Sequence, residues 1–156
     1  MEATSSTAKE SGERELVITR VFNAPRSLVF KAWADPERQA QWLGPKGFTT
    51  ISVQMDGYVG GSYRFGMRAP DGSAHWLRGV HREIVEPERL VFTSAWEDAD
   101  GKPGHETLIT LTFEEEGGKT RLTLHQTGFE SVTSRDMHHG GWSSNFDKLA
   151  DYLATL

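Results

Sequence analysis

The chain has 156 residues, of which 37% are hydrophobic and 25% are charged, a balance typical of one soluble globular domain. No cysteine is present, which excludes disulfide bonds, thiol catalysis and cysteine-based zinc sites and suits a cytoplasmic protein. The formal net charge of -5 argues against general attraction to nucleic acid or anionic membranes. No stretch approaches the roughly 18 apolar residues of a membrane span.

The first residues of the chain are polar, and a strand is predicted directly after them. Residues 1–13 have no apolar run of the kind found in signal peptides and are expected to form a disordered tail. The folded domain is therefore expected to cover residues 14–156. The segment ELVITRVF, which starts at Glu15, is rich in β-branched residues and predicts a strand.

Two short helices are predicted next. Apolar residues at spacings of three and four predict a helix over residues 25–34. Asp35 as N-cap and Pro36 at the first helical position start a second short helix, which carries Trp42 and ends at Gly44.

After these helices the apolar period changes to two, and turn signals rich in glycine, proline and aspartate interrupt it. The alternation predicts strands over residues 48–56, 61–69, 74–86, 89–97, 105–115 and 119–127, followed by a helix over residues 133–155. Because strands alternate with turns and not with helices, we expect an α+β domain with a meandering antiparallel sheet.

In each strand, one of the two alternating sets of side chains is mainly apolar and is expected to face the core. These sets are Ile51, Val53 and Met55; Tyr63, Phe65 and Met67; Leu77, Gly79 and His81; Leu90, Phe92, Ser94 and Trp96; Ile109, Leu111 and Phe113; and Leu122, Leu124 and Gln126. His125 belongs to the opposite set and is expected to point toward solvent.

The final helix carries an apolar stripe whose two halves differ. At about 100 degrees per residue, the stripe contains Trp142, Phe146, Leu149, Leu153 and Leu156, with His138, His139 and Asn145 on its N-terminal part. Gly140 and Gly141 lie in the same part, where each interior glycine costs a helix roughly 1 kcal/mol relative to alanine. We expect the C-terminal half to seal against the sheet and the glycine-containing half to act as a lid beside a cavity.

Several inward-facing residues are polar, which is unusual for a dry core. They are Tyr63, His81, Ser94, Gln126, His138 and Asn145. Buried polar groups need partners, so these residues either satisfy one another, bind internal water or line a ligand cavity. As a group they favour the cavity.

The order of the elements and a set of short motifs resemble a known family. The motifs are Ala24-Pro25-Arg26-Ser27-Leu28-Val29-Phe30 with Trp33, Asp35-Pro36-Glu37, Gln41-Trp42-Leu43-Gly44-Pro45, Gly60-Gly61 with Tyr63 and Phe65, Glu86-Pro87-Glu88-Arg89-Leu90, Gln126-Thr127-Gly128-Phe129, and Gly141-Trp142 with Leu149. Over residues 15–156 they resemble the homologues of the activator of the heat-shock protein 90 ATPase. These homologues belong to the START-like superfamily, also called SRPBCC or the polyketide cyclase/dehydrase and lipid-transport superfamily.

This resemblance implies a helix-grip fold, in which a curved antiparallel sheet wraps around a long C-terminal helix and leaves a hydrophobic cavity. Members of the superfamily bind lipids, sterols, polyketides or hormones, and some are enzymes, so the fold alone does not assign a function. Two departures limit what can be transferred from the family, and the first of them argues against chaperone activation. A short polar tail stands where the eukaryotic co-chaperone has a further domain, and Tyr58 stands where members often have arginine.

We expect a small hydrophobic or aromatic molecule, such as a lipid or a polyketide, to bind between the sheet and the final helix without being chemically changed. The expected walls are Trp42, Phe48, Tyr63, Phe65, Phe92, Trp142 and Phe146, and the expected polar anchors are His81, Gln126, His138 and Asn145. No catalytic residue, metal ligand or cofactor is expected. The sequence has no Gly-x-Ser-x-Gly motif, and the adjacent His138 and His139 lack the i, i+4 spacing of a helical metal site.

Two other functions stay open. A cyclase-like or aromatase-like enzyme would use His81 and His138, because acid–base catalysis needs only one or two titratable groups near the reacting carbon. A protein-interaction module related to the heat-shock protein 90 ATPase activators would use exposed residues instead.

Overall fold

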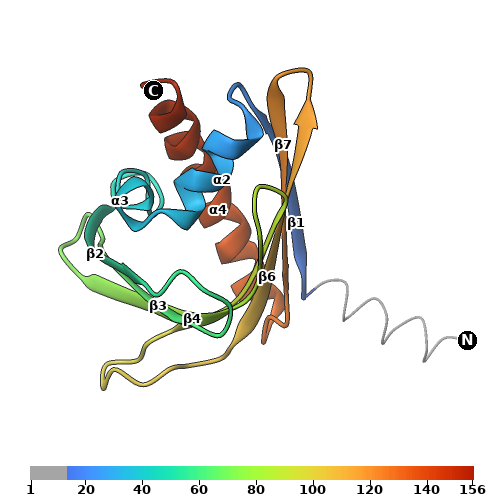
Figure 1. The fold of residues 1–156 in the computed structure, drawn as a ribbon. Helices are drawn as coiled ribbons and strands as arrows, with labels where there is room; N and C mark the ends of the chain where they lie inside the picture. The colour runs from blue at the N-terminus through green and yellow to red at the C-terminus, as the bar shows by residue number, and fades with distance from the viewer. Residues whose placement is uncertain (1–13) are drawn as a thin grey trace, which may run out of the picture.

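A single antiparallel sheet of seven strands curves around the C-terminal helix (Figure 1). This computed structural model describes residues 14–156, and the tail expected over residues 1–13 lies outside the described residues. The elements in chain order are β1 (Leu16–Phe22), α2 (Arg26–Ala34), α3 (Pro36–Gln39), β2 (Thr49–Met55), β3 (Ser62–Arg68), β4 (Ala74–Val85), β5 (Arg89–Trp96), β6 (Thr107–Glu116), β7 (Lys119–Thr127) and α4 (Val132–Leu153). The helix-grip architecture expected from the sequence is confirmed.

The strand order across the sheet is β1-β7-β6-β5-β4-β3-β2. Strands β2 to β7 form the predicted meander, in which each strand pairs antiparallel with the next one in the chain. Strand β1 completes the other edge by pairing with β7, so α2 and α3 connect the two edges of the sheet. α2, α3 and α4 lie on the concave side of the sheet, as Figure 1 shows.

The second short helix is shorter than predicted. α3 ends at Gln39, and Trp42 lies in the tight turn that follows it. In this turn the Trp42 backbone N–H donates to the Gln39 carbonyl at 3.2 Å, and its indole Nε1 donates to the Ala32 carbonyl at 3.1 Å. The indole contact joins Trp42 to α2, and Gly44, two residues further on, has a φ of +88°.

The predicted core faces of the strands are largely correct, with two exceptions. Ile51 is 38% exposed because the register between β2 and β3 shifts at a bulge between Thr50 and Ser52. Trp96 is 39% exposed because it ends β5 at the edge of the concave face. On the predicted stripe of the final helix, Leu156 is 58% exposed because it lies beyond the end of α4.

α4 is a continuous helix from Val132 to Leu153, including the glycine pair. Ser131 caps its start by accepting a hydrogen bond from the Ser134 N–H at 3.0 Å. The C-terminal half seals against the sheet as expected, since Phe146, Leu149 and Leu153 are buried. Within residues 14–156, none of the helices combines the length and the apolar character that a membrane crossing requires.

Polar contacts fasten one side of α4 to the segment between α3 and β2. Ser144 Oγ accepts from the Lys46 backbone N–H at 2.8 Å. The Lys148 ammonium donates to the carbonyl oxygens of Leu43 at 3.0 Å and Phe48 at 3.2 Å. These three hydrogen bonds hold residues 43–48 against the helix.

Candidate ligand-binding cavity

A cavity of about 450 Å³ lies between the concave face of the sheet and the N-terminal half of α4. The residues that line it are Leu43, Gly44, Pro45, Phe48, Met67, His75, Leu77, Ser94, Trp96, Gln126, Met137, His138, Gly141, Trp142 and Asn145. Most of these side chains are apolar or aromatic, and none of those lining residues is Asp, Glu, Lys or Arg. Both the volume and the lining are typical of a site for an uncharged small molecule.

A series of rings follows one side of the cavity from the 43–48 segment to α4. The ring centroids of Phe48 and His75 lie 6.1 Å apart, and those of His75 and Trp96 lie 6.3 Å apart. Trp96 continues the series to His138 at 6.4 Å, and His138 contacts Phe129 at 4.9 Å. These spacings are typical of tilted and edge contacts between rings. The series joins two strands of the sheet to the helix.

Gln126 is buried on β7, and its side-chain amide connects polar groups of the cavity wall through hydrogen bonds. Its Oε1 accepts from Trp142 Nε1 at 2.8 Å, and its Nε2 donates to Thr107 Oγ1 at 2.8 Å. Thr107 Oγ1 in turn donates to the Ser94 carbonyl at 3.2 Å. This chain of hydrogen bonds fixes the Trp142 indole against the sheet and engages both ends of the Gln126 amide.

His138 is held through both ring nitrogens. Its Nδ1 lies 2.7 Å from the Ser134 carbonyl, and its Nε2 lies 3.1 Å from Trp96 Nε1. The indole N–H can only donate and the carbonyl can only accept, so this arrangement requires the neutral imidazole with its proton on Nδ1. His138 therefore acts as a bridge between α4 and β5. Within residues 14–156, no group of three or more His, Asp or Glu residues is placed to hold a metal ion.

Asn145 differs from the other polar residues of the wall. It is 5% exposed, it lines the cavity, and its Oδ1 has no hydrogen-bond partner within residues 14–156. A buried amide oxygen without a partner is uncommon, because leaving it unpaired costs roughly 1–3 kcal/mol. Asn145 thus lines the cavity and carries a buried amide oxygen that no described protein group pairs.

The structure brings part of the predicted binding set together. Of the residues expected to bind a ligand, Phe48, Gln126, His138, Trp142 and Asn145 line the cavity, whereas Trp42, Tyr63, Phe65, His81, Phe92 and Phe146 do not. The second group is packed into the core at exposures of 8% or less. Both groups share the concave side of the sheet, so the alternation of the strands could not separate them.

Four of the packed residues form a ring cluster beside the cavity. Tyr63 lies at the centre, with its ring centroid 4.6 Å from Phe65, 5.5 Å from His81 and 5.7 Å from Phe92. Its hydroxyl crosses to β5 and donates to the Thr93 carbonyl at 2.5 Å. This cluster fills the part of the concave face that the sequence assigned to the ligand.

Several lining residues were missed by the sequence prediction. His75 has the same parity in β4 as the inward-facing Leu77 and pairs with Met67, so the alternation could have identified it. Met137 lies one helical turn before Gly141 and was not part of the predicted apolar stripe. Pro45 was named only as part of a family motif and was not predicted to line the cavity.

The two glycines of α4 face different surroundings. A Cβ on Gly140 would meet no atom within 4 Å among the described residues, whereas Gly141 lines the cavity and a Cβ there would lie 3.8 Å from Pro45 Cγ. Neither position has a positive φ, so the helix itself does not require glycine. At Gly141 the missing side chain leaves room for the cavity.

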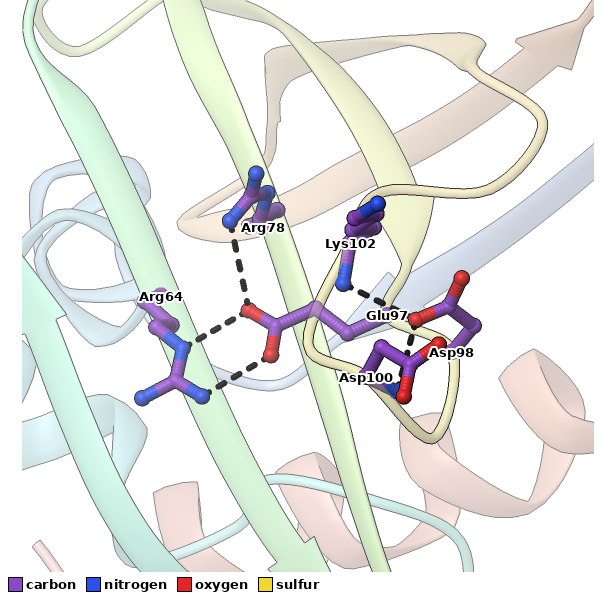
Figure 2. A network of polar contacts seen from close by, with 6 residues as sticks. All are labelled: Arg64, Arg78, Glu97, Asp98, Asp100 and Lys102. Atoms are coloured by element: carbon purple, nitrogen blue, oxygen red, sulfur yellow. Dashed lines mark hydrogen bonds and ion pairs between the residues drawn. The ribbon is translucent and has the colours of Figure 1, made fainter.

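A network of charged residues lies next to Trp96, at the end of β5. Figure 2 shows the carboxylate of Glu97, the next residue, between Arg64 of β3 and Arg78 of β4. Arg64 binds it through two hydrogen bonds of 2.7 and 2.8 Å, and Arg78 approaches to 3.8 Å. The hydrogen bonds from Arg64 hold the pKa of Glu97 below its ordinary value. Asp98 then closes the following turn by accepting two backbone N–H groups at 2.9 Å each.

Replacing Glu97 by glutamine is expected to lower the free energy of unfolding by about 1–2 kcal/mol at pH 7, because the ion pair is lost but the arginines stay hydrated. The depressed pKa stabilises the fold above the ordinary value of 4.5, and this contribution is lost as the pH falls below it. Urea unfolding at pH 7 and pH 3.5 measures both effects. The exposed Glu115→Gln is the control, and an equal loss in the two variants would contradict the role of Glu97.

His81 gives the fold a second pH dependence. Burial lowers its pKa from the ordinary value of 6.5, against the opposing influence of the Gly61 carbonyl and the Asp56 carboxylate. The unfolded chain then binds a proton more readily, so stability is complete above pH 6.5 and falls as the pH drops below it. We expect His81→Phe to flatten the decline in unfolding free energy between pH 7.5 and pH 5.5, measured by urea unfolding. Tyr63→Phe in the same cluster should keep the wild-type slope.

A curved antiparallel sheet around a C-terminal helix, with an apolar cavity between them, defines the chain as a START-like helix-grip protein. The family model described as "Activator of Hsp90 ATPase homolog 1-like protein" matches residues 23–154, and the chain belongs to this family. No curated protein matches the sequence.

Solved structures of other proteins have the same fold. A crystal structure of a protein from Chromobacterium violaceum is 28% identical, with a TM-score of 0.82 over 90% of this chain and 96% of that one. The AHSA1 protein from Silicibacter pomeroyi is 26% identical, with a TM-score of 0.82 over 90% of this chain and 98% of that one. A solution structure from Arthrobacter aurescens is 24% identical and has a TM-score of 0.81, over 94% and 89% of the two chains.

Proposed function

We propose that this protein binds a small apolar or aromatic molecule in the cavity between the sheet and α4, without changing it chemically. The observation that carries the proposal is the cavity itself, whose volume of about 450 Å³ is lined mainly by apolar and aromatic side chains. Burying apolar ligand surface there would contribute roughly 25 cal/mol per Å². The polarizable sulfur atoms of Met67 and Met137 suit contact with aromatic rings.

The test uses the two tryptophans of the wall as reporters. The chain has five tryptophans, and a spectrum of 15N-labelled indole groups observes each N–H separately. On addition of 2-naphthol, the signals of Trp96 and Trp142 should shift, because both residues line the cavity. Trp76 stacks against the Arg64 guanidinium at 3.9 Å, outside the lining, and should not shift. Shifts of all five signals, or of none, would contradict the proposal.

The family description favours a second candidate function, an interaction with the Hsp90 chaperone. It would depend on exposed residues and would not need the cavity. Hsp90 ATPase activity measured with and without the full chain tests it. Stimulation that survives a cavity-filling substitution would support the interaction, and no stimulation would exclude it.

Catalysis by His81 and His138 has no comparable support. His81 lies outside the cavity lining, and both ring nitrogens of His138 are engaged. A cytoplasmic location stays a prediction from the composition.

A further inference from the structure

Two hydrogen bonds between lining residues join the sheet to α4 within residues 14–156, and one of them has a titratable acceptor. Trp142 Nε1 donates to Gln126 Oε1 at 2.8 Å, and Trp96 Nε1 donates to His138 Nε2 at 3.1 Å. An amide does not change its protonation near neutral pH, whereas an imidazole does. Of these two bonds, the one between Trp96 and His138 can therefore respond to pH.

Protonation would turn the acceptor of this bond into a donor. The Ser134 carbonyl, 2.7 Å from Nδ1, already holds the proton of the neutral His138 ring, so a second proton adds at Nε2. The new N–H would face the Trp96 indole N–H, which places two donors 3.1 Å apart with no acceptor between them. Flipping the imidazole does not restore the bond, because both nitrogens of an imidazolium carry protons. Protonated His138 thus keeps its bond within α4 and loses its bond to β5.

The surroundings of His138 provide no carboxylate that would take the place of Trp96. Its contacts are the Ser134 carbonyl of α4, Trp96 of β5 and the Phe129 ring in the segment before α4, at 4.9 Å between centroids. The titratable side chains next to these contacts are Glu130 and His139, which are exposed; Arg135, which donates to Asp136; Glu97, which binds Arg64; Asp98, which accepts two backbone N–H groups; His75, which contacts Ser73; and His105, which contacts the Gly128 carbonyl. Each of them is exposed or engaged elsewhere, so none of the described groups replaces the lost bond.

The Trp96 indole borders both the cavity and the solvent. The residue is 39% exposed and lines the cavity, so its ring can turn outward without leaving the hydrophobic core. Its backbone is held independently of the ring. The Trp96 carbonyl accepts from the Gly104 N–H at 2.7 Å, and the N–H of the next residue, Glu97, donates to the Trp76 carbonyl at 2.9 Å. Loss of the bond to His138 therefore frees a side chain at the cavity edge and leaves the strand in place.

We infer that protonation of His138 releases the Trp96 indole and opens the cavity, so that a bound molecule leaves faster under mildly acidic conditions. This inference rests on the proposed function and adds a means of regulation to the same site. The bond between Trp142 and Gln126 does not titrate, so the cavity wall stays joined to α4 at that point. The loss of one hydrogen bond corresponds to a change of roughly tenfold in the rate of release.

The first measurement uses the ligand-free protein, with 15N-labelled indole and imidazole groups. Between pH 8 and pH 5, the Trp96 indole signal should move toward its position in His138→Phe, which lacks the acceptor. The midpoint of this movement should equal the midpoint of the His138 imidazole signals in the same sample. The Trp142 indole signal should not follow His138, because its acceptor is an amide.

The second measurement is the dissociation rate of 2-naphthol, which stays uncharged over this pH range, from exchange broadening of the Trp142 indole signal. In the wild type the rate should be roughly tenfold higher at pH 5 than at pH 8. In His138→Phe it should be high at both values. In His138→Gln, whose amide accepts a hydrogen bond but does not titrate, it should be low at both.

Two control variants separate His138 from the other histidines near the cavity. His139 is exposed and lies outside the lining, and His75 lies inside it. His139→Gln and His75→Gln should both keep the tenfold ratio between the two pH values. Circular dichroism at pH 5 verifies that each protein is folded, since protonation of His81 affects overall stability in the same range.

The outcomes separate this inference from the proposed function. If 2-naphthol does not shift the indole signals at pH 8, the proposed function fails, and the Trp96 signal of the ligand-free protein decides the inference. If 2-naphthol binds but its dissociation rate does not change with pH, or changes equally in His138→Gln, only the inference fails. Should the variants not fold, the agreement or disagreement of the Trp96 and His138 midpoints in the wild type decides by itself.

Discussion

Replacing Gly141 by leucine is expected to abolish the binding of 2-naphthol while raising the melting temperature. The new side chain would extend from the cavity wall, where a Cβ has an ordinary contact of 3.8 Å with Pro45, into the space a ligand needs. The loss of affinity should exceed about thirtyfold, because the ligand and the side chain cannot share the volume. Leucine also stabilises a helix by roughly 0.8 kcal/mol relative to glycine, which corresponds to a few degrees in a chain of this size.

Gly140→Leu is the matched control for this substitution. Gly140 belongs to the same helix and gains the same helical propensity, but a Cβ there faces open space among the described residues. The control should melt a few degrees higher and bind 2-naphthol as the wild type does. Equal affinities of the two leucine variants, measured by indole titration, would show that the ligand does not occupy the space beside Gly141.

Phe146→Ala is expected to lower the free energy of unfolding by about 3–5 kcal/mol, the largest effect on stability that we predict. Phe146 is 0% exposed, and its ring contacts those of Phe22, Trp33 and Trp142 at centroid distances of 5.8 to 6.2 Å. Deleting the ring leaves a hole where α4 packs on β1 and α2. Urea unfolding followed by circular dichroism measures the loss.

Phe48→Ala tests whether Phe48 belongs to the cavity wall or to the hydrophobic core. Phe48 is half-buried and lines the cavity, so its removal should cost about 1–2 kcal/mol of stability but weaken the binding of 2-naphthol severalfold. A loss of stability as large as that of Phe146→Ala would place Phe48 in the core instead of the wall.

Most of the fold was predictable because it depends on local rules. Alternation along β3 selected Tyr63, Phe65 and Met67, and all three are buried. The same rule was wrong at Ile51, where a bulge reverses the direction of the side chains. A bulge results from the pairing of two strands and leaves no mark in the sequence of either strand alone.

The site was predictable only in part. Helical spacing and strand parity identified Asn145 and Gln126, since both face inward by simple periodicity. These two patterns could not distinguish Phe92, which packs against Tyr63, from Phe48, which lines the cavity, because both rings lie on the concave side of the sheet. Which part of that side stays empty depends on how α4 crosses the sheet.

The two edges of the cavity are joined to α4 by different numbers of hydrogen bonds, and this difference affects the rate of ligand exchange. Residues 43–48 are tied to α4 by three hydrogen bonds, from Lys46 to Ser144 and from Lys148 to two carbonyls. Across the cavity, Trp96 is joined to the helix by a single one, to His138. We expect entry and escape on the Trp96 side, so that rupture of the Trp96–His138 contact, together with that between Trp142 and Gln126, governs how long a guest molecule resides inside.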